Sequence, residues 1–585
     1  MGLVLFFLLT IVVDCLIVRV SMRGTIINDS PRKSISTLLY ARLVVFILEL
    51  IWTVYGTASI LLHMPVCDSK PRVYWLACAA VLTGWLVFII QGIMFVSAFN
   101  FRGKHKQVII SKHDWEKRWQ GIFCCLNVEE NRHVFATLSQ LCMQLFKKEE
   151  ELVTSDILAG LILVYHKQHV TRQQLDVVDA PLLSSRIRSQ PHKIATSPSV
   201  PRMSWMTLTE AAHYMKYALG SYGWPYYIGL NNPIIATCNL LPKLNWSMLT
   251  PESHITNDNK LLANTAAFCL RTGCSYDDIV CVSFHNEIYA IPFFVCIDKT
   301  TESVIVAVRG TLSLEDILTD LVVERAPVCF GGIKGSVHTG MFQSAKYIRN
   351  KLITDGILDF AFRKANGYRL VITGHSLGAG VAALLALELR TMYPNLICFA
   401  FATPGELVSD NLLPYTEEFI CTVALGYDVV PRLGLLEAIK LRIDILNAIK
   451  TCPLPKYQVI GRGIWTKFFT KADLEHVECV NTDYEKADWF DAYIREETVE
   501  KNAIIEKFEP LYPPGQILHV LEKNDIKRPW NVTPEYYAEW TDCKGFREIM
   551  LSTRMIAHHF PDTLLTALQQ LASHDHDSHT GKKTN

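Results

Sequence analysis

The residues best suited to chemistry lie in a short glycine-rich segment, GHSLGAG, which runs from Gly374 to Gly380. The segment contains the pattern G-x-S-x-G, follows the apolar run YRLVIT and precedes the Ala/Leu-rich run VAALLALELRTMY. A strand, this pattern and then a helix form a strained turn that presents a serine hydroxyl above a sheet. Side chains at 374 and 378 are expected to collide with neighbouring elements, which explains the glycines. We therefore predict that Ser376 is an acyl-transfer nucleophile.

Such a serine requires a base to take its proton and a carboxylate to orient that base. In this type of fold the three residues follow in the order Ser, Asp, His. Asp428 fits the second role, because it lies in GYDVVPR directly after the strand-like run CTVAL. The candidate bases downstream are His476, His519, His558, His559 and the tail cluster from His574 to His579.

Among these candidates we favour His559. It lies in IAHHFPD, just after the strand-like run REIMLS, where a loop at the carboxyl edge of the sheet is expected. His519 lies inside a predicted strand, so we expect it to belong to the core. Order along the chain does not prove proximity, and the alternative that His558 and His559 are surface loop residues stays open.

An oxyanion hole requires two backbone donors, one from the residue after the nucleophile and one from a loop after an earlier strand. Leu377 follows the nucleophile. SVIVAVRGT ends a predicted strand at Arg309, and Thr311 can contribute its amide and hydroxyl. An ordinary glycine turn at Gly310 is the alternative.

These residues depend on elements that place them at one edge of a sheet. From about Trp205 onward short apolar runs alternate with helical patterns, which predicts an α/β domain with a largely parallel sheet over 205–572. Thr207 and Glu210 have the spacing of a helix-capping box at its start. The predicted strands are 303–308, 368–373, 397–402, 421–425 and 516–520.

The composition concentrates its hydrophobic excess at the N-terminal end. Half of the 585 residues are hydrophobic and 19% are charged, with 57 basic and 57 acidic residues. This balance gives no electrostatic reason to bind nucleic acid and argues against a disordered chain. Residues 43–62 and 73–99 meet the roughly 20 apolar residues that a bilayer requires, and residues 2–18 are a shorter candidate. We predict a transmembrane region over 1–106 with spans at about 2–18, 43–62 and 73–99.

Two acidic residues fall inside the predicted spans. Asp14 and Glu49 are costly in lipid, so we expect them to face the helix bundle. The alternative for residues 2–18 is a cleaved signal peptide, but no basic leader precedes this run and no small-residue cleavage site follows it.

Basic residues at the ends of the spans predict the orientation. Lys and Arg are more frequent after the first and third spans than between the second and third, which places the segment after Phe99 in the cytoplasm. The 17 cysteines show no paired framework, as a reducing compartment predicts. The sequons at Asn245 and Asn531 are then expected to carry no glycan.

Three other regions differ from the catalytic pattern. Residues 107–204 are predicted to be a helical connector followed by a flexible linker. The long spacing between Asp428 and His559 predicts an insertion at about 435–510, either a lid or a surface elaboration. Residues 573–585 form a polar tail in which metal binding is less favoured than disorder.

Five motifs occur in the order typical of the class 3 lipase family of α/β-hydrolases. They are VRGT (308–311), VHTGMF (337–342), TGHSLGAG (373–380), FATPG (401–405) and DVVPR (428–432). With the membrane segments, LYPPGQILHV (511–520) and HHFP (558–561), the whole chain resembles the sn-1-specific diacylglycerol lipases, closest to the beta type.

The resemblance implies a fold, a substrate and roles. It implies an α/β-hydrolase domain preceded by transmembrane helices, with Ser376 as nucleophile, Asp428 as orienting acid, His559 as base, and Thr311 and Leu377 at the oxyanion hole. It implies release of the sn-1 fatty acid from diacylglycerol at the plasma membrane to leave 2-arachidonoylglycerol, an endocannabinoid. Calcium stimulation is also implied, although no calcium-binding loop is visible and the chemistry requires no metal. Relatives of this type have four membrane segments, so residues 1–30 are the least secure part of the comparison.

Overall fold

The computed structural model describes a large part of the 585 residues, and all that follows concerns these ranges alone. They are 2–21, 33–62, 78–79, 81–86, 88, 156–169, 202–230, 232–245, 254–256, 258, 260–285, 289–310, 325–452, 454, 456–468, 510–523 and 534–580. They divide into two compact units, which we describe separately. One holds the described residues of 1–109, 148–164 and 445–491, and the other holds the remainder.

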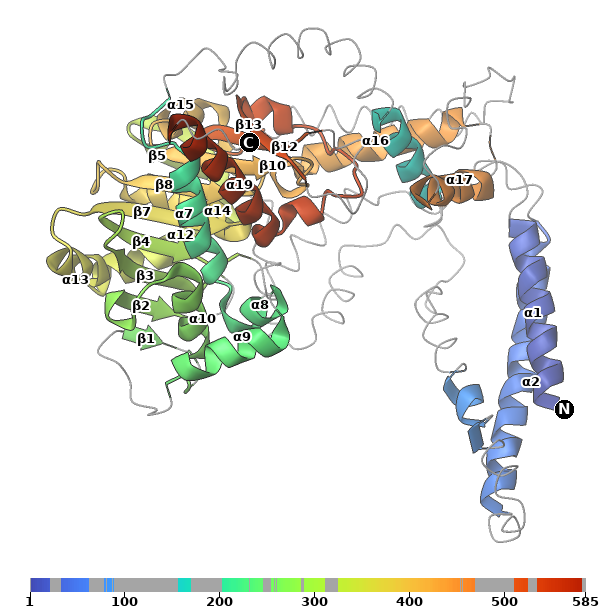
Figure 1. Ribbon diagram of the computed structural model, residues 1–585. Coiled ribbons are helices and arrows are strands. Elements are labelled where there is room, and N and C mark those ends of the chain that lie inside the picture. Colours follow the sequence, from blue (N-terminus) through green and yellow to red (C-terminus); the bar gives the residue numbers. More distant parts are fainter. Residues whose placement is uncertain are drawn as a thin grey trace. The chain divides into compact units, whose positions relative to one another are not determined.

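The larger unit is built on a nine-stranded sheet with the order β1-β2-β3-β4-β7-β8-β10-β12-β13 (Figure 1). Its middle strands β4, β7, β8, β10 and β12 run parallel to one another, whereas β3 and β13 pair antiparallel with their neighbours. The five predicted strands are these five middle strands. The bounds are β1 His254–Thr256, β2 Ile279–Ser283, β3 Phe293–Asp298, β4 Ser303–Val308, β7 Arg369–His375, β8 Ile397–Phe401, β10 Ile420–Leu425, β12 Gln516–Glu522 and β13 Tyr536–Thr541.

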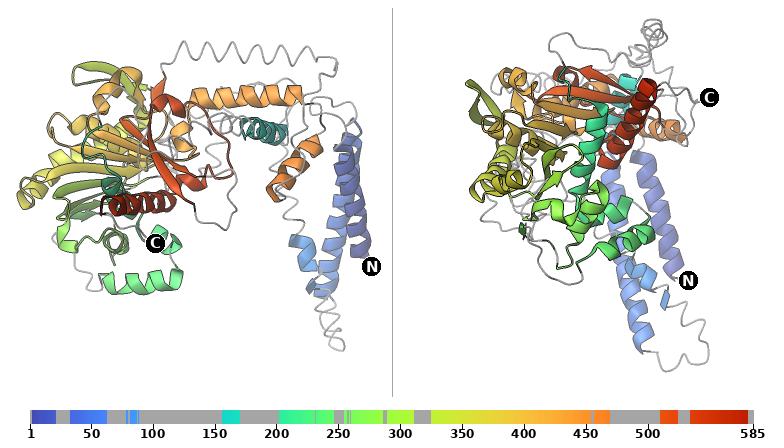
Figure 2. Two further views of the ribbon diagram at one scale, coloured as in Figure 1. Left: turned by 45° about the horizontal axis from the view of Figure 1, so that its top comes forward. Right: turned by 60° about the vertical axis from the view of Figure 1, so that its left-hand side comes forward.

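Helices cover both faces of this sheet, which is why β3, β4 and β10 are buried along their whole length. On one face α12 (Thr339–Thr354), α13 (Ile357–Lys364) and α14 (Leu377–Leu389) enclose a core of aliphatic side chains. On the other face α7 (Leu208–Gly220), α10 (Ala263–Thr272) and α19 (Pro561–Thr580) pack on an aromatic core. Helices α7 and α19 lie side by side on that face (Figure 2).

Smaller elements complete this unit. A four-stranded antiparallel sheet has the order β11-β9-β6-β5. Its bounds are β5 Arg325–Phe330, β6 Ile333–His338, β9 Val408–Ser409 and β11 Leu511–Tyr512, and the short helices are α8 Gly223–Leu230, α9 Pro233–Leu240, α15 Leu413–Thr416, η4 Leu241–Lys243, η5 Tyr276–Asp278, η6 Asp410–Leu412, η7 Val430–Arg432, η9 Cys543–Phe546 and η10 Ala557–His559.

The predicted helix cap at the start of α7 is confirmed. The Thr207 hydroxyl accepts a hydrogen bond from the Glu210 amide at 3.1 Å. The Glu210 carboxylate instead pairs with Arg369 at the beginning of β7. This ion pair links α7 to the strand that leads to Ser376.

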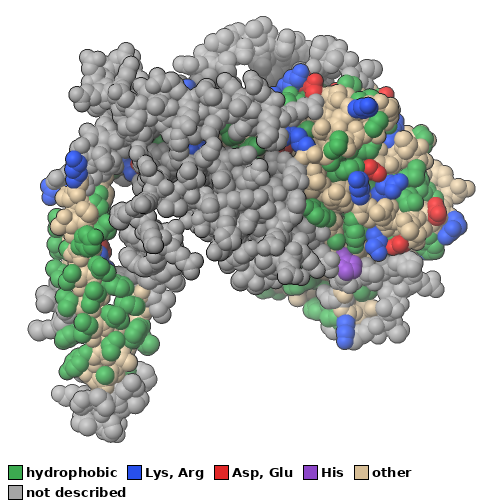
Figure 3. All heavy atoms as spheres, turned by 180° about the vertical axis from the view of Figure 1, so that it is seen from behind, with side chains coloured by type: hydrophobic (Ala, Val, Ile, Leu, Met, Phe, Trp, Pro, Cys, Tyr) green, Lys and Arg blue, Asp and Glu red, His purple; other side chains and the backbone are tan. Residues whose placement is uncertain are grey.

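The N-terminal unit contains two long apolar helices, α1 (Gly2–Ser21) and α2 (Ile35–Leu62). Within the described residues, one helix is long and apolar enough to cross a bilayer, and it covers Ile35–Ile60. Figure 3 shows hydrophobic side chains along the surface of this helix pair. Helix α2 begins before the second predicted span, 43–62, and contains all of it. The third, 73–99, lies mostly outside the described residues.

A polar cluster between α1 and α2 explains the earlier start of α2. Arg42 contacts Asp14 at 3.0 Å and Glu49 at 3.4 Å, and the Thr10 hydroxyl donates to Glu49. The charge of Arg42 is paired within the helix pair, so α2 continues through this residue to its start at Ile35. Both acidic residues contact the partner helix, as predicted.

The predicted insertion begins with two helices, α16 (Leu435–Thr451) and α17 (Lys456–Phe468). Residues 469–509 lie outside the described residues, as do most of the predicted connector and linker, apart from a helical stretch over 156–169. Disorder is the wrong prediction for the start of the tail, because α19 continues to Thr580.

Candidate active site

The turn that carries Ser376 has the strained backbone that the sequence pattern predicts. β7 ends at His375, α14 begins at Leu377, and Ser376 between them has φ 59° and ψ −129°. Positive φ is costly for a residue with a side chain, so surrounding contacts must hold it. One such contact is the hydrogen bond from the Ser376 amide to the Phe401 carbonyl, at 2.9 Å.

The two glycines of the motif are required by close backbone approach. A Cβ atom on Gly374 would lie 2.2 Å from the Gly378 carbonyl oxygen. A Cβ atom on Gly378 would lie 2.5 Å from the Val308 carbonyl oxygen and 2.6 Å from that of Arg309. These neighbours are main-chain atoms and cannot rotate away. The predicted collisions at 374 and 378 are therefore confirmed.

Ser376, His559 and Asp428 form a continuous hydrogen-bonded chain. The His559 Nε2 atom lies 2.9 Å from the Ser376 hydroxyl oxygen. On the other side of the ring, Nδ1 lies 3.0 Å and 3.2 Å from the two carboxylate oxygens of Asp428. A carboxylate accepts, so Nδ1 carries a hydrogen and Nε2 is left to accept the serine proton. This is the geometry of a nucleophile, its base and the group that orients the base.

Burial distinguishes the three members. Asp428 is 1% exposed and Ser376 is 6% exposed, whereas 22% of the His559 side chain is exposed. Asp428 also accepts a hydrogen bond from the Val430 amide at 3.0 Å, which fixes its carboxylate just beyond the end of β10. The buried Ser376 and Asp428 thus hold the partly exposed His559 ring from both sides.

His558 has a different position from its neighbour. It is 2% exposed, and its Nδ1 accepts a hydrogen bond from the Tyr427 amide at 3.0 Å. Its Nε2 lies 3.3 Å from the buried carboxylate of Glu522. His558 therefore packs behind the turn that carries Asp428, and the alternative that both histidines are surface loop residues is wrong.

His375 connects the elbow to the main chain of His559. Its Nδ1 lies 2.8 Å from the Tyr222 hydroxyl and its Nε2 lies 2.9 Å from the His559 carbonyl oxygen. Burial, followed by the proximity of His559, holds the pKa of His375 well below its usual range. His375 is therefore neutral at physiological pH.

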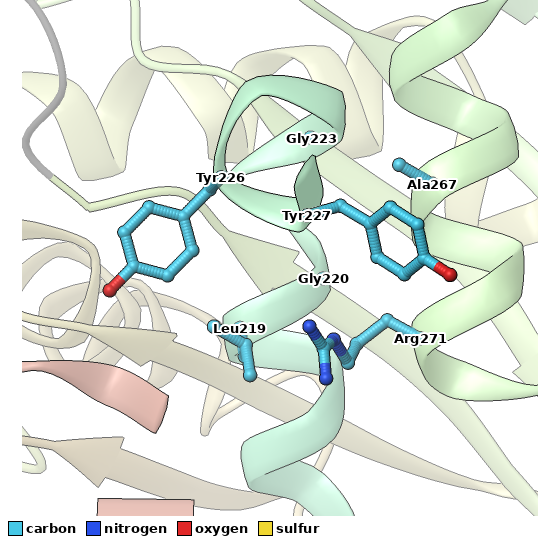
Figure 4. A pocket seen from close by; sticks show the side chains of 7 residues that line it. All are labelled: Leu219, Gly220, Gly223, Tyr226, Tyr227, Ala267 and Arg271. Atoms are coloured by element: carbon cyan, nitrogen blue, oxygen red, sulfur yellow. The ribbon is translucent and has the colours of Figure 1, made fainter. Parts of the chain in front are cut away.

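A small hollow lies between the end of α7, α8 and α10 (Figure 4). Its volume is about 10 Å³, which is room for about one water and not for a lipid. Tyr226 and Tyr227 point in opposite directions from α8 in this view. The Tyr227 ring lies under the Arg271 guanidinium, whereas the Tyr226 hydroxyl donates to Asp562 of α19.

Comparison with known proteins identifies the family. A model described as the diacylglycerol lipase N-terminal transmembrane region matches residues 1–99, and one described as lipase (class 3) matches residues 305–437. Diacylglycerol lipase-beta of Mus musculus is 31% identical over 95% of this chain and 86% of its own length. The chain belongs to the diacylglycerol lipase family.

A second relative and one solved structure are also similar to the chain. Diacylglycerol lipase-alpha of Homo sapiens is 30% identical over 96% of this chain, and the chain spans 57% of that relative's length. Among solved structures, mono- and diacylglycerol lipase from Aspergillus oryzae is 21% identical, with a TM-score of 0.29 over 40% of this chain and 76% of its own. As a member of the diacylglycerol lipase family, the chain has an α/β-hydrolase fold and is a serine ester hydrolase.

The predicted oxyanion donors are only partly described. Leu377 is fully buried at the first position of α14, where the amides of a helix N-terminus favour negative charge. Thr311 lies outside the described residues, which stop at Gly310 on this side.

The other described histidine candidates have different positions and contacts from His559. His519 donates from Nε2 to the Gly426 carbonyl, and His574 lies on α19. His476 lies outside the described residues. Within the described part of the chain, no group of three or more His, Cys, Asp or Glu side chains could hold a metal ion, so no calcium ligands are assigned.

Tyr222 and His375 are the residues that sequence reasoning missed. His375 lies inside the motif, but its partners are 153 and 184 positions away in the chain. No local pattern marks Tyr222 in the run SYGWPYY. The sequence contains only an indirect sign of this contact, the glycine at 310. A Cβ atom there would lie 2.1 Å from the Tyr222 hydroxyl oxygen.

Proposed function

We propose that the chain hydrolyses the sn-1 ester of diacylglycerol within a membrane, releasing a fatty acid and 2-monoacylglycerol. When the sn-2 chain is arachidonoyl, the product is 2-arachidonoylglycerol, an endocannabinoid. Support comes from the names of two relatives, diacylglycerol lipase-beta and diacylglycerol lipase-alpha, and from their match along nearly the whole chain.

In this proposal Ser376, His559 and Asp428 divide the work of ester hydrolysis. The Ser376 oxygen attacks the ester carbonyl while His559 Nε2 takes the hydroxyl proton, and the bond to the glycerol oxygen breaks as His559 returns that proton. Water then attacks the acyl-enzyme, again giving a proton to His559, and the fatty acid leaves as Ser376 recovers its hydrogen. Asp428 holds the imidazole and stabilises its charged form.

The amides of Leu377 and Thr311 are proposed as the oxyanion donors. Both amides would donate hydrogen bonds to the negative oxygen that forms during attack and deacylation. Preorganised donors lower the energy of the transition state most at this atom. The start of α14 at Leu377 supports this role for the first of them.

The observation that carries the proposal is the unbroken chain of contacts from Ser376 through His559 to Asp428. The distances from the His559 nitrogens to the Ser376 and Asp428 oxygens, 2.9 Å and 3.0 Å, are normal hydrogen-bond lengths. A fold retained only as a binding scaffold has no need of all three groups in this geometry.

The proposed location is the plasma membrane, crossed more than once, with the catalytic unit in the cytoplasm. The match of residues 1–99 to a transmembrane region supports membrane attachment. The basic residues that follow the first and third predicted spans support the orientation. Attachment keeps the enzyme beside a substrate that does not dissolve in water.

A fluorophosphonate probe tests the serine chemistry. Full-length protein in detergent is expected to be labelled at Ser376, and Ser376→Ala is expected to lose labelling and roughly 10⁴-fold or more of the esterase rate. Ser573→Ala, a change at an exposed serine on α19, serves as the control and should retain both. Labelling and hydrolysis that survive Ser376→Ala would overturn the proposed mechanism.

Positionally labelled lipids test the substrate. The protein in lipid nanodiscs receives diacylglycerol labelled separately at sn-1 and sn-2, with phospholipid, triacylglycerol, monoacylglycerol and an acylated peptide in parallel. Release of the sn-1 label first is expected. Faster cleavage of another of these substrates, or release of the sn-2 label first, would contradict the assignment.

A further inference from the structure

The contacts around His375 define one arrangement of hydrogens. A carbonyl oxygen only accepts, so the contact with the His559 carbonyl requires a hydrogen on His375 Nε2. Because the buried ring is neutral, its Nδ1 has a lone pair and accepts the Tyr222 hydroxyl hydrogen. The result is a directed chain from Tyr222 to His375 to the main chain of His559.

This chain acts on the residue that must be placed most accurately. The His559 ring reaches Ser376 and Asp428 from the end of the short helix η10, which has one turn to hold it. The His559 amide donates to the Ile556 carbonyl at 3.1 Å, and His375 Nε2 donates to the His559 carbonyl at 2.9 Å. The two imidazole rings lie 4.9 Å apart between centroids. Rotation of the His559 backbone would therefore break the contact with His375.

The far end of the chain is also fixed. Tyr222 is buried and lies two residues after the end of α7. Its hydroxyl lies against Gly310, because a Cβ atom at 310 would collide with this hydroxyl and with the His375 carbonyl oxygen. Its ring packs on Tyr226 with centroids 5.1 Å apart. The tyrosine hydroxyl therefore has a constrained position from which to hold His375.

Charge makes the neutral state of His375 useful. In the proposed reaction His559 becomes an imidazolium when it takes the serine proton, and a second cation in contact with it would oppose that step. A neutral imidazole holds the His559 carbonyl without adding charge. A lysine or arginine could donate the same hydrogen bond but would add a positive charge.

We propose that Tyr222 and His375 are positioning residues that hold His559 between Ser376 and Asp428 through its main-chain carbonyl. This inference rests on the proposed serine mechanism. It assigns the two residues no contact with substrate.

The test compares kcat and KM of full-length variants in detergent with a water-soluble short-chain ester. His375→Phe removes both hydrogen bonds but keeps a planar ring, and kcat is expected to fall about 10- to 100-fold with KM unchanged, because misplacing a reacting group by about 1 Å costs this much. His375→Gln keeps a side-chain N–H that can reach the His559 carbonyl, so it should recover most of the loss. Tyr222→Phe removes one hydroxyl and is expected to reduce kcat by about 3- to 10-fold.

Tyr226→Phe is the matched control, because it removes a neighbouring tyrosine hydroxyl that bonds to Asp562 and not to His375. Its kcat should equal that of the unaltered protein. Thermal melting separates loss of fold from loss of positioning, and Tyr222→Phe keeps the test decisive if His375→Phe does not fold. Wild-type kcat in Tyr222→Phe, or equal losses in His375→Gln and His375→Phe, would overturn the proposal. If Ser376→Ala remained active, the serine mechanism itself would fail, which is a distinguishable result.

Discussion

His519 couples the stability of the catalytic unit to pH. Burial lowers its pKa to about 4, and its Nε2–H donates to the Gly426 carbonyl at 2.9 Å, two positions before Asp428. An unfolded chain binds a proton at this histidine below about pH 6.5, whereas the folded chain resists protonation down to about pH 4. The stabilisation is thus complete above pH 6.5 and is lost as the pH falls between these values.

Replacing this histidine should remove that pH dependence. His519→Gln keeps a side-chain donor but no group that titrates in this range, so the fall in melting temperature between pH 6.5 and 4 should become shallower, by an amount equivalent to at most about 3 kcal/mol. His574→Gln, at an exposed position on α19, should leave the slope as it is. An identical slope in His519→Gln and the unaltered protein would contradict this account.

At the residue scale, a site residue can be predicted from the sequence when its role requires a particular local backbone conformation or sequence pattern. Gly374 and Gly378 are predictable because the neighbouring backbone leaves no room for a side chain, and Ser376 is predictable because it lies between them in the motif. Asp428 is predictable because a carboxylate after a buried strand emerges at the sheet edge. Tyr222 is not, because its role depends only on a tertiary contact with His375.

At the element scale, the beginning of α16 is attached to the catalytic unit by buried charges. The Glu406 carboxylate accepts the Leu435 amide at 3.1 Å, which caps the helix, and lies 3.8 Å from Arg325. Burial raises the pKa of Glu406, so its charge depends on these partners. In the first turn Glu437 contacts Arg547 at 3.4 Å. These contacts hold the first turn of α16, with which the insertion begins, against the catalytic unit.

Removing that cap should loosen the beginning of α16. Glu406→Ala leaves the Leu435 amide without its acceptor and Arg325 without this carboxylate, at a cost of about 1–3 kcal/mol, so amide hydrogen exchange over 435–444 should be roughly 5- to 100-fold faster. Lys440→Gln breaks an exposed pair with Glu548 at 3.9 Å and should change exchange little. Equal exchange in Glu406→Ala and the unaltered protein would show that the cap does not hold the helix.

The periodicity of the sequence predicts the middle of the sheet better than its edges. β4, β7, β8, β10 and β12 are continuous apolar runs because both faces are covered. The antiparallel pairing of β3 with its neighbours and the small sheet of β5, β6, β9 and β11 depend on long-range register, which no local run specifies. The start of α2 at Ile35 was not predicted for a similar reason, since one of the two acidic partners of Arg42, Asp14, is on another helix.

At the scale of the whole molecule, the balanced charge of 57 basic and 57 acidic residues conceals a local asymmetry. Basic residues gather after the first and third predicted spans, and by the positive-inside rule this asymmetry is the basis of the proposed cytoplasmic side for the residues after Phe99.

The two sequons give a direct test of this orientation. Asn245 and Asn531 would both lie on the cytoplasmic side, away from the glycosylation machinery, so glycosidase treatment of protein from animal cells should leave its mass unchanged. A sequon on a spacer fused ahead of Met1 would lie on the opposite side of the membrane and should be glycosylated, which shows that the cells can modify this chain. Glycan on Asn531 together with an unmodified fused sequon would reverse the orientation and put the hydrolase outside the cytoplasm.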